Sequence, residues 1–126
     1  MSFLSRWFSK PKSTETKFPN VVVGRIMSIE NHPNADRLRC VEVDVGETLK
    51  IVCGAPNIEV GQLVPVAMVG ASLPSGIVIQ QAALRGVDSF GMLCAADELG
   101  IGTDHSGIMV LSGGTVGEPI DKYINS

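Results

Sequence analysis

From Phe18 onward the hydrophobic and polar positions follow a strand-like pattern. Short apolar runs rich in Val and Ile are separated by polar turns that carry most of the Gly and Pro residues, as in strands bounded by turns. We predict seven strands, at Val21–Glu30, Arg37–Val45, Thr48–Cys53, Leu63–Val69, Ile77–Gln81, Gly91–Ala95 and Ile108–Leu111. The run Val45-Gly46-Glu47-Thr48 indicates a tight hairpin. Many short strands predict an all-β barrel or sandwich.

Helical patterns are short. Ala95–Leu99 precedes a stop at Gly100, and Pro119–Ile124 begins with a proline at a favourable first position. We therefore expect two small helices beside a β domain, and we find no internal repeat.

The first 17 residues have a different pattern. Phe3, Leu4, Trp7 and Phe8 recur at helical spacing until Pro11, and a polar stretch follows up to Lys17. This segment is interpreted either as a basic amphipathic helix for a membrane surface or partner groove, or as a flexible tail. We therefore divide the chain into a tail at 1–17 and a domain at 18–126.

The charge is also divided at this boundary. The 126 residues, 44% hydrophobic and 18% charged, fit one domain with a real core, and the net charge is −3. Residues 1–17 carry four basic side chains and one acidic (+3), which leaves six basic and twelve acidic (−6) for 18–126. This balance excludes a binder that holds nucleic acid by bulk positive charge. Any such partner must meet a local basic patch.

The three cysteines form an odd set without a CxxC motif, which favours free thiols in a reducing compartment over a disulfide framework. No apolar run is long enough to span a membrane, and the start of the chain lacks a signal-peptide pattern. We expect a cytoplasmic location.

No pattern in the sequence indicates catalysis. Phosphate-cradling glycine loops are absent, and the two histidines, His32 and His105, have no partners at metal-binding spacing. We therefore expect no metal, no cofactor and no enzymatic activity of the chain itself.

Three polar turns are the most specific features. They read HPNADRL from His32, IVCGAPN from Ile51 and LRGVDSFGMLCAADELGI from Leu84. Pro, Asn, Asp and Gly stabilise turns in any β protein, so a purely structural role is an alternative for each of them.

In this order and at these separations, the three motifs resemble the tRNA-binding OB-fold domain of the EMAP II type. The resemblance covers about Val21 to Ile124 and is strongest to the module near the N-terminus of the bacterial phenylalanyl-tRNA synthetase β subunit. It implies a five-stranded OB-fold barrel with short helices and a small C-terminal extension.

The resemblance also implies a tRNA-binding surface of six residues: Asn34, Arg37, Asn57, Arg85, Ser89 and Met92. The arginines would contact phosphates, the amides and the hydroxyl would bond sugar or phosphate oxygens, and Met92 would support the loop by packing. Arg39 and Lys50 could widen the patch. The implied partner is tRNA, recognised through backbone and shape. The alternative is a structural OB module that contacts synthetase subunits or a second copy of itself.

Overall fold

The computed structural model describes residues 18, 20–74, 76–100, 102 and 107–123. The predicted tail at 1–17 and the last residue of the predicted C-terminal helix, Ile124, lie outside this part of the chain. Seven strands are present: β1 (Val21–Asn31), β2 (Arg39–Asp44), β3 (Thr48–Cys53), β4 (Leu63–Met68), β5 (Ala82–Leu84), β6 (Val87–Ser89) and β7 (Gly91–Leu93). Two single-turn 3₁₀ helices follow, η2 (Asp97–Leu99) and η3 (Ile120–Lys122).

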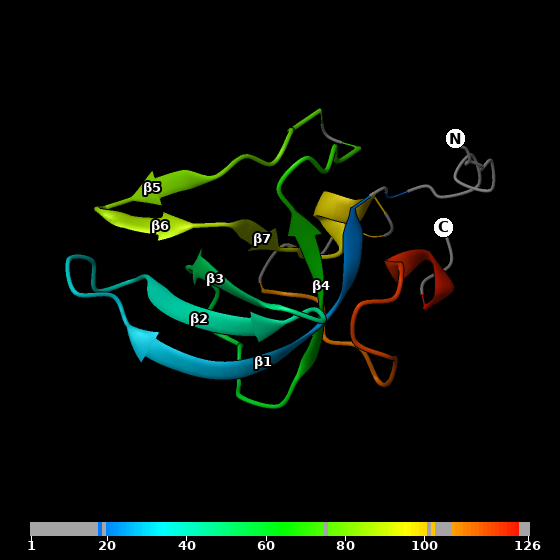
Figure 1. Ribbon diagram of the computed structural model, residues 1–126, viewed down its shortest axis with the longest axis horizontal. Coiled ribbons are helices and arrows are strands. Elements are labelled where there is room, and N and C mark those ends of the chain that lie inside the picture. The colour runs from blue at the N-terminus through cyan, green and yellow to red at the C-terminus, as the bar shows by residue number, and fades with distance from the viewer. Residues whose placement is uncertain (1–17, 19, 75, 101, 103–106, 124–126) are drawn as a thin grey trace, which may run out of the picture.

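Five of the strands form one antiparallel sheet in the order β3-β2-β1-β4-β7. The sheet curls so that its two ends meet: the amide of Phe90, just before β7, donates to the carbonyl oxygen of Lys50 on β3 at 2.8 Å. The resulting ring of neighbours is the topology of an OB-fold barrel. Figure 1 shows the curled sheet, with β1 running along its lower side. The predicted fold class is confirmed.

β1 belongs to both halves of the barrel. Its first residues pair with β4 and its later residues pair with β2, and the register shifts between Ile26 and Ser28. A bulge of this kind bends a strand and increases its twist. At Gly24 a Cβ atom would lie 2.5 Å from the side chain of Val66 and 2.7 Å from that of Val43. Only glycine lets the strand pass so close to both neighbours.

On β2 the core follows the alternation of apolar and polar residues. On β2, Val41 and Val43 are buried while Glu42 between them is exposed. The buried side chains form two clusters, one centred on the barrel strands and one that includes Leu99 of η2 and Ile120 of η3. The C-terminal extension is tied to β1 by two bonds, from the Val23 amide to the Glu118 carbonyl at 2.9 Å and from the Gly117 amide to the Val23 carbonyl at 2.8 Å.

Two predicted strands are wrong. Ile77–Gln81 makes only one isolated bridge, between Ser72 and Val78, and Ile108–Leu111 makes only one, between Leu63 and Leu111. The backbone there bonds in short loop contacts, such as Gly70 to Ile79, in place of a continuous ladder. Conversely, the β5–β6 hairpin lies in a segment that we expected to be a loop.

The predicted helix at Ala95–Leu99 is a shorter 3₁₀ turn, which ends as expected at Gly100 with a left-handed φ of 72°. None of the helices in the described ranges is long and apolar enough to cross a membrane.

Candidate nucleic-acid interface

Two loops far apart in the sequence meet at one end of the barrel. They are the β1–β2 loop, residues 32–38, and the tip of the β5–β6 hairpin, Leu84 to Val87; both lie at the left edge of Figure 1. The side-chain amide of Asn34 donates to the carbonyl oxygen of Arg85 at 3.0 Å. In return the Arg85 guanidinium donates to the main-chain carbonyl of Asn34 at 3.3 Å. These two loops occupy the positions at which OB-folds bind oligonucleotides.

His32 forms a third bond between the loops. Its Nε2 lies 2.8 Å from the carbonyl oxygen of Leu84, and the amide of Asn34 donates to its Nδ1 at 2.9 Å. Since Nδ1 accepts, Nε2 must carry the proton, so the ring is the neutral Nε2–H tautomer. The side chain is only 6% exposed although its loop lies at the surface. His32 is not among the six residues selected from the sequence, because its bonding partner is 52 residues away and is a main-chain atom.

Arg85 has a strained backbone. Leu84 and Val87 are paired, so Arg85 and Gly86 form a two-residue hairpin loop, with φ of 55° and 91°. Positive φ at both positions is characteristic of a type I′ turn, in which Asn and Gly are the favoured residues. An arginine at the first position is disfavoured. The reciprocal bonds with Asn34 help to hold it there.

Two further arginines lie near the β1–β2 loop and differ in their bonding. Arg37 is exposed in the turn before β2, and its guanidinium makes no hydrogen bond with the described residues. Arg39, at the start of β2, donates to the carbonyl oxygens of Ala55 at 3.2 Å and Pro56 at 3.5 Å. Arg37 is therefore available for a ligand, whereas Arg39 stabilises the turn after β3.

Asn57 and Ser89 bond to the protein's own backbone. The Asn57 amide donates to the carbonyl of Ile108 and accepts from its amide, both at 2.9 Å. Ser89 is 4% exposed; its hydroxyl accepts from the Val52 amide at 3.0 Å and donates to the Gly91 carbonyl at 3.2 Å. Ser89 therefore joins the third motif to the second, and Asn57 joins the second motif to the segment at Ile108.

Met92 on β7 is partly buried against the hydrophobic core. Of the six residues selected from the sequence, the structure thus joins Asn34 and Arg85 directly and places Arg37 on the same loop as Asn34. It places Asn57, Ser89 and Met92 within the supporting structure.

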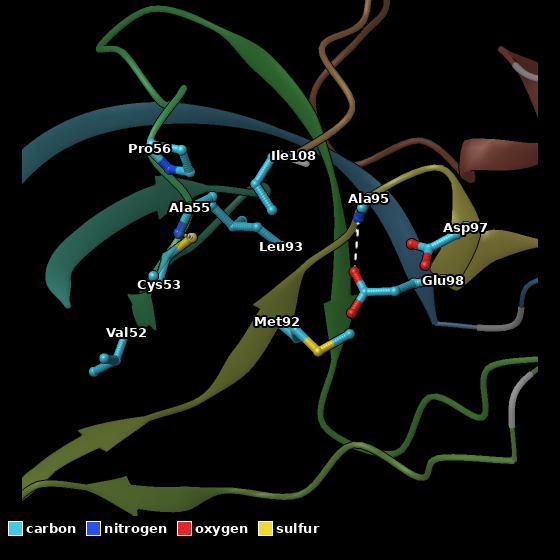
Figure 2. A pocket seen from close by; sticks show the side chains of 12 residues that line it. Val52, Cys53, Ala55, Pro56, Met92, Leu93, Ala95, Asp97, Glu98 and Ile108 are labelled. Carbon is cyan, nitrogen blue, oxygen red and sulfur yellow. Dashed lines mark hydrogen bonds between the residues drawn. The ribbon is translucent and has the colours of Figure 1, made fainter. Parts of the chain in front are cut away.

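A pocket of about 390 Å³ opens beside the turn that follows β3. Figure 2 shows its walls, which include Pro56, Met92 and Ile108, with the carboxylates of Asp97 and Glu98 at one side. One Glu98 oxygen accepts from the amide of Ala95, just before η2, at 2.7 Å. The two carboxylates make the pocket unfavourable for a phosphate group.

Two buried thiols lie in or near this pocket, and both remain protonated at neutral pH. Burial raises the pKa of Cys53, with the Ala55 amide and Arg39 acting against this effect. Burial and, second, the charge of Glu98 raise the pKa of Cys94 to about 12. A protonated thiol is a poor nucleophile. Among the described residues no group of His, Cys, Asp and Glu side chains could hold a metal ion.

Residues 21–118 match the sequence family described as "Putative tRNA binding domain". The chain belongs to this tRNA-binding domain family. The matched range includes all seven strands and both loops of the interface. The tRNA-binding domain is also similar along its whole length, at 49% identity, to the phenylalanine–tRNA ligase beta subunit of Chlorobium luteolum. Over 72% of its length it is 58% identical to that of Nitratidesulfovibrio vulgaris. It spans only 16% and 12% of these two relatives.

Solved structures of similar fold include the C-terminal domain of Plasmodium vivax p43, at 26% identity and a TM-score of 0.57 over 81% of this tRNA-binding domain and 58% of that chain. A MetRS-related protein from Pyrococcus horikoshii, at 20% identity, has a TM-score of 0.58 over 89% of this domain and 97% of that chain. The second likeness shows the fold alone.

Proposed function

We propose that the chain binds folded tRNA through the surface formed by the β1–β2 loop and the tip of the β5–β6 hairpin. The observation that carries the proposal is the bonded contact between these loops, at the ligand-binding end of an OB-fold, in a member of a tRNA-binding domain family. Arg37 and Arg85 contact phosphates from the two loops.

The remaining residues selected from the sequence support this surface. Asn34 joins the loops, while Asn57 and Ser89 fix the turn after β3 and the base of the hairpin. Met92 packs against the hydrophobic core. The acidic pocket at Glu98 does not take the phosphate backbone.

Within a longer protein of the kind to which it is similar, the chain contributes tRNA binding and no catalytic step. The basis for this proposal is the similarity to phenylalanine–tRNA ligase beta subunits. The chain spans about one sixth or less of their length. In that setting its other neighbours are synthetase subunits, and the protein acts in the cytoplasm.

A filter-binding titration with total tRNA at low salt tests the proposal. We expect weak binding that falls steeply with salt, because each phosphate contact adds roughly 0.7–0.9 to the slope of log K against log salt. Arg37→Ala should weaken binding and reduce this slope. Arg25→Ala is the matched control: Arg25 is also exposed, but it bonds to the Gly61 carbonyl at 3.3 Å, away from the two loops. No binding at tens of micromolar would refute the proposal.

A protein-contacting role is the second candidate. Several large apolar side chains between β4 and β7 are exposed, namely Val69, Ile77, Val78, Leu84 and Phe90. Two of them, Val78 and Leu84, line a groove with Leu38 and Met92. Apolar patches of this kind mark surfaces that are covered by a partner. Under this alternative, Val78→Asp abolishes self-association or subunit binding, measured by light scattering, and leaves tRNA affinity unchanged.

A further inference from the structure

We propose that His32 is a positioning residue for RNA binding, and that its bond to the Leu84 carbonyl, rather than its bond within its own loop, is the one that matters. The inference rests on the proposed function. It assigns the link between the two loops to a side chain that does not touch the ligand.

The bonding of the imidazole excludes a direct contact. Both ring nitrogens are in use, Nδ1 with the Asn34 amide and Nε2 with the Leu84 carbonyl. The ring is 6% exposed, while the residues around it, Pro33, Asn34 and Leu84, are exposed. A neutral, buried and fully bonded imidazole cannot bind a phosphate. It can set the distance between the loops that do.

The hairpin needs such a support because it has little core of its own. All three residues of β5 are exposed, and β5 pairs only with β6. An isolated two-stranded hairpin is marginally stable in water. At its base the hairpin is attached to the barrel through Ser89, whose hydroxyl accepts from the Val52 amide. At its tip the attachment includes the bonds from His32 and Asn34 and the bond that Arg85 donates to the Asn34 carbonyl.

The attachment affects the affinity for RNA because it keeps the hairpin tip against the β1–β2 loop, which is the conformation that binds. If the tip leaves the β1–β2 loop for part of the time, the apparent Kd rises in inverse proportion to the fraction that remains in place. Arg85 is the residue most affected, because it lies in the turn and bonds to Asn34 with both its carbonyl and its guanidinium. His32 therefore acts on RNA through Arg85.

Two substitutions separate the two bonds of the ring. In His32→Gln the amide nitrogen reaches the position of Nε2 and can still donate to the Leu84 carbonyl, while the acceptor for the Asn34 amide is lost. In His32→Asn the shorter side chain keeps an acceptor near the position of Nδ1, which can still bond the Asn34 amide, and the bond between the loops is lost. Asn at this position also favours a local turn, so the β1–β2 loop itself is preserved.

We expect His32→Asn to weaken tRNA binding about 3- to 10-fold, the equivalent of one hydrogen bond, and His32→Gln to bind within about 2-fold of the unchanged chain. A role confined to the β1–β2 loop predicts the opposite order. In a chain that already carries Arg85→Asn, the effect of His32→Asn should shrink, since the residue through which it acts is gone.

Melting temperatures of all variants, measured alongside, identify any that do not fold. In that case Asn34→Ala, at an exposed position, breaks the neighbouring contact between the loops and should weaken binding by a similar factor. The inference is overturned if His32→Asn binds as well as the unchanged chain, if His32→Gln is as weak as His32→Asn, or if the losses with Arg85→Asn are additive. Failure of the unchanged chain to bind tRNA overturns the proposed function itself.

Discussion

Arg85 offers a test in which binding and stability change in different ways. A non-glycine residue in the left-handed region costs roughly 1–2 kcal/mol, and Asn tolerates this region better than most residues. Arg85, with φ of 55°, carries this cost. Arg85→Asn relieves part of it and keeps the bond from Asn34 to the main-chain carbonyl at this position. It removes only the guanidinium bond to the Asn34 carbonyl, an exposed contact worth about 0.5–1 kcal/mol.

These two opposing contributions determine the change in the free energy of unfolding. The relief and the loss nearly cancel, so we expect the free energy of unfolding of Arg85→Asn to stay within about 1 kcal/mol of the original. Arg85→Ala is the matched control, because it loses the same bond and keeps the strain. The Asn variant should therefore melt about 2–6 °C above the Ala variant.

Thermal unfolding and a tRNA titration at several salt concentrations measure both effects. Both variants should bind tRNA more weakly, with the salt slope reduced by roughly 0.7–0.9 for one lost phosphate contact. Unchanged affinity in either variant would show that Arg85 does not contact RNA. An Asn variant that melts below the Ala variant would show that the backbone at this turn is not strained.

Three further predictions concern the supporting residues. Asn57→Ala should lower the free energy of unfolding in urea by about 1–3 kcal/mol, because both main-chain groups of Ile108 lose their partner; Asn57→Asp, which faces the Ile108 carbonyl with an oxygen, should be no better. Ser89→Ala should cost about 1–3 kcal/mol by leaving the buried Val52 amide unpaired, and Ser89→Cys should not restore the loss. Burial raises the pKa of Cys94 from 9.0 to about 12, so above pH 9 the unfolded chain loses a thiol proton that the folded chain retains. Stability should therefore fall as the pH rises from 9 towards 12, and Cys94→Ala should flatten this slope.

The sequence predicted the barrel strands well, because each is a short apolar run with buried residues on the barrel side. Thr48–Cys53 is predicted to the residue, and β1, β2, β4 and β7 are predicted to within one or two residues at each end. Each of these strands has neighbours on both sides in the barrel sheet or closes it, so its pattern of apolar residues reports burial directly.

The segment between β4 and β7 was harder to predict. Ile77–Gln81 has the composition of a strand, but Ile77 and Val78 are exposed, and the chain there forms loop contacts in place of a ladder. The β5–β6 hairpin turns at Arg85-Gly86, and arginine is not a typical residue for that turn. Its conformation depends on Asn34, which lies about fifty residues earlier.

The candidate site is likewise only partly predictable from the sequence, because contacts with distant residues decide how its side chains are used. The sequence selects polar residues in turns but does not show whether a side chain faces solvent or main chain. Arg37 is exposed, whereas Asn57 and Ser89 bond to backbone groups of distant residues, as does the unselected His32. Family resemblance selected the turns, and the structure adds which of the selected side chains are exposed, such as Arg37, and which bond to the protein's own backbone, such as Asn57 and Ser89.

The most direct test of the central claim is an NMR titration of the ¹⁵N-labelled chain with tRNA, observing backbone and arginine side-chain signals. We predict that the largest changes occur at Asn34 to Arg37 and at Arg85 and Gly86, with little change at Arg25 or in the β2–β3 hairpin. Changes confined to residues 1–17, or to the outer faces of β2 and β3, would contradict the account.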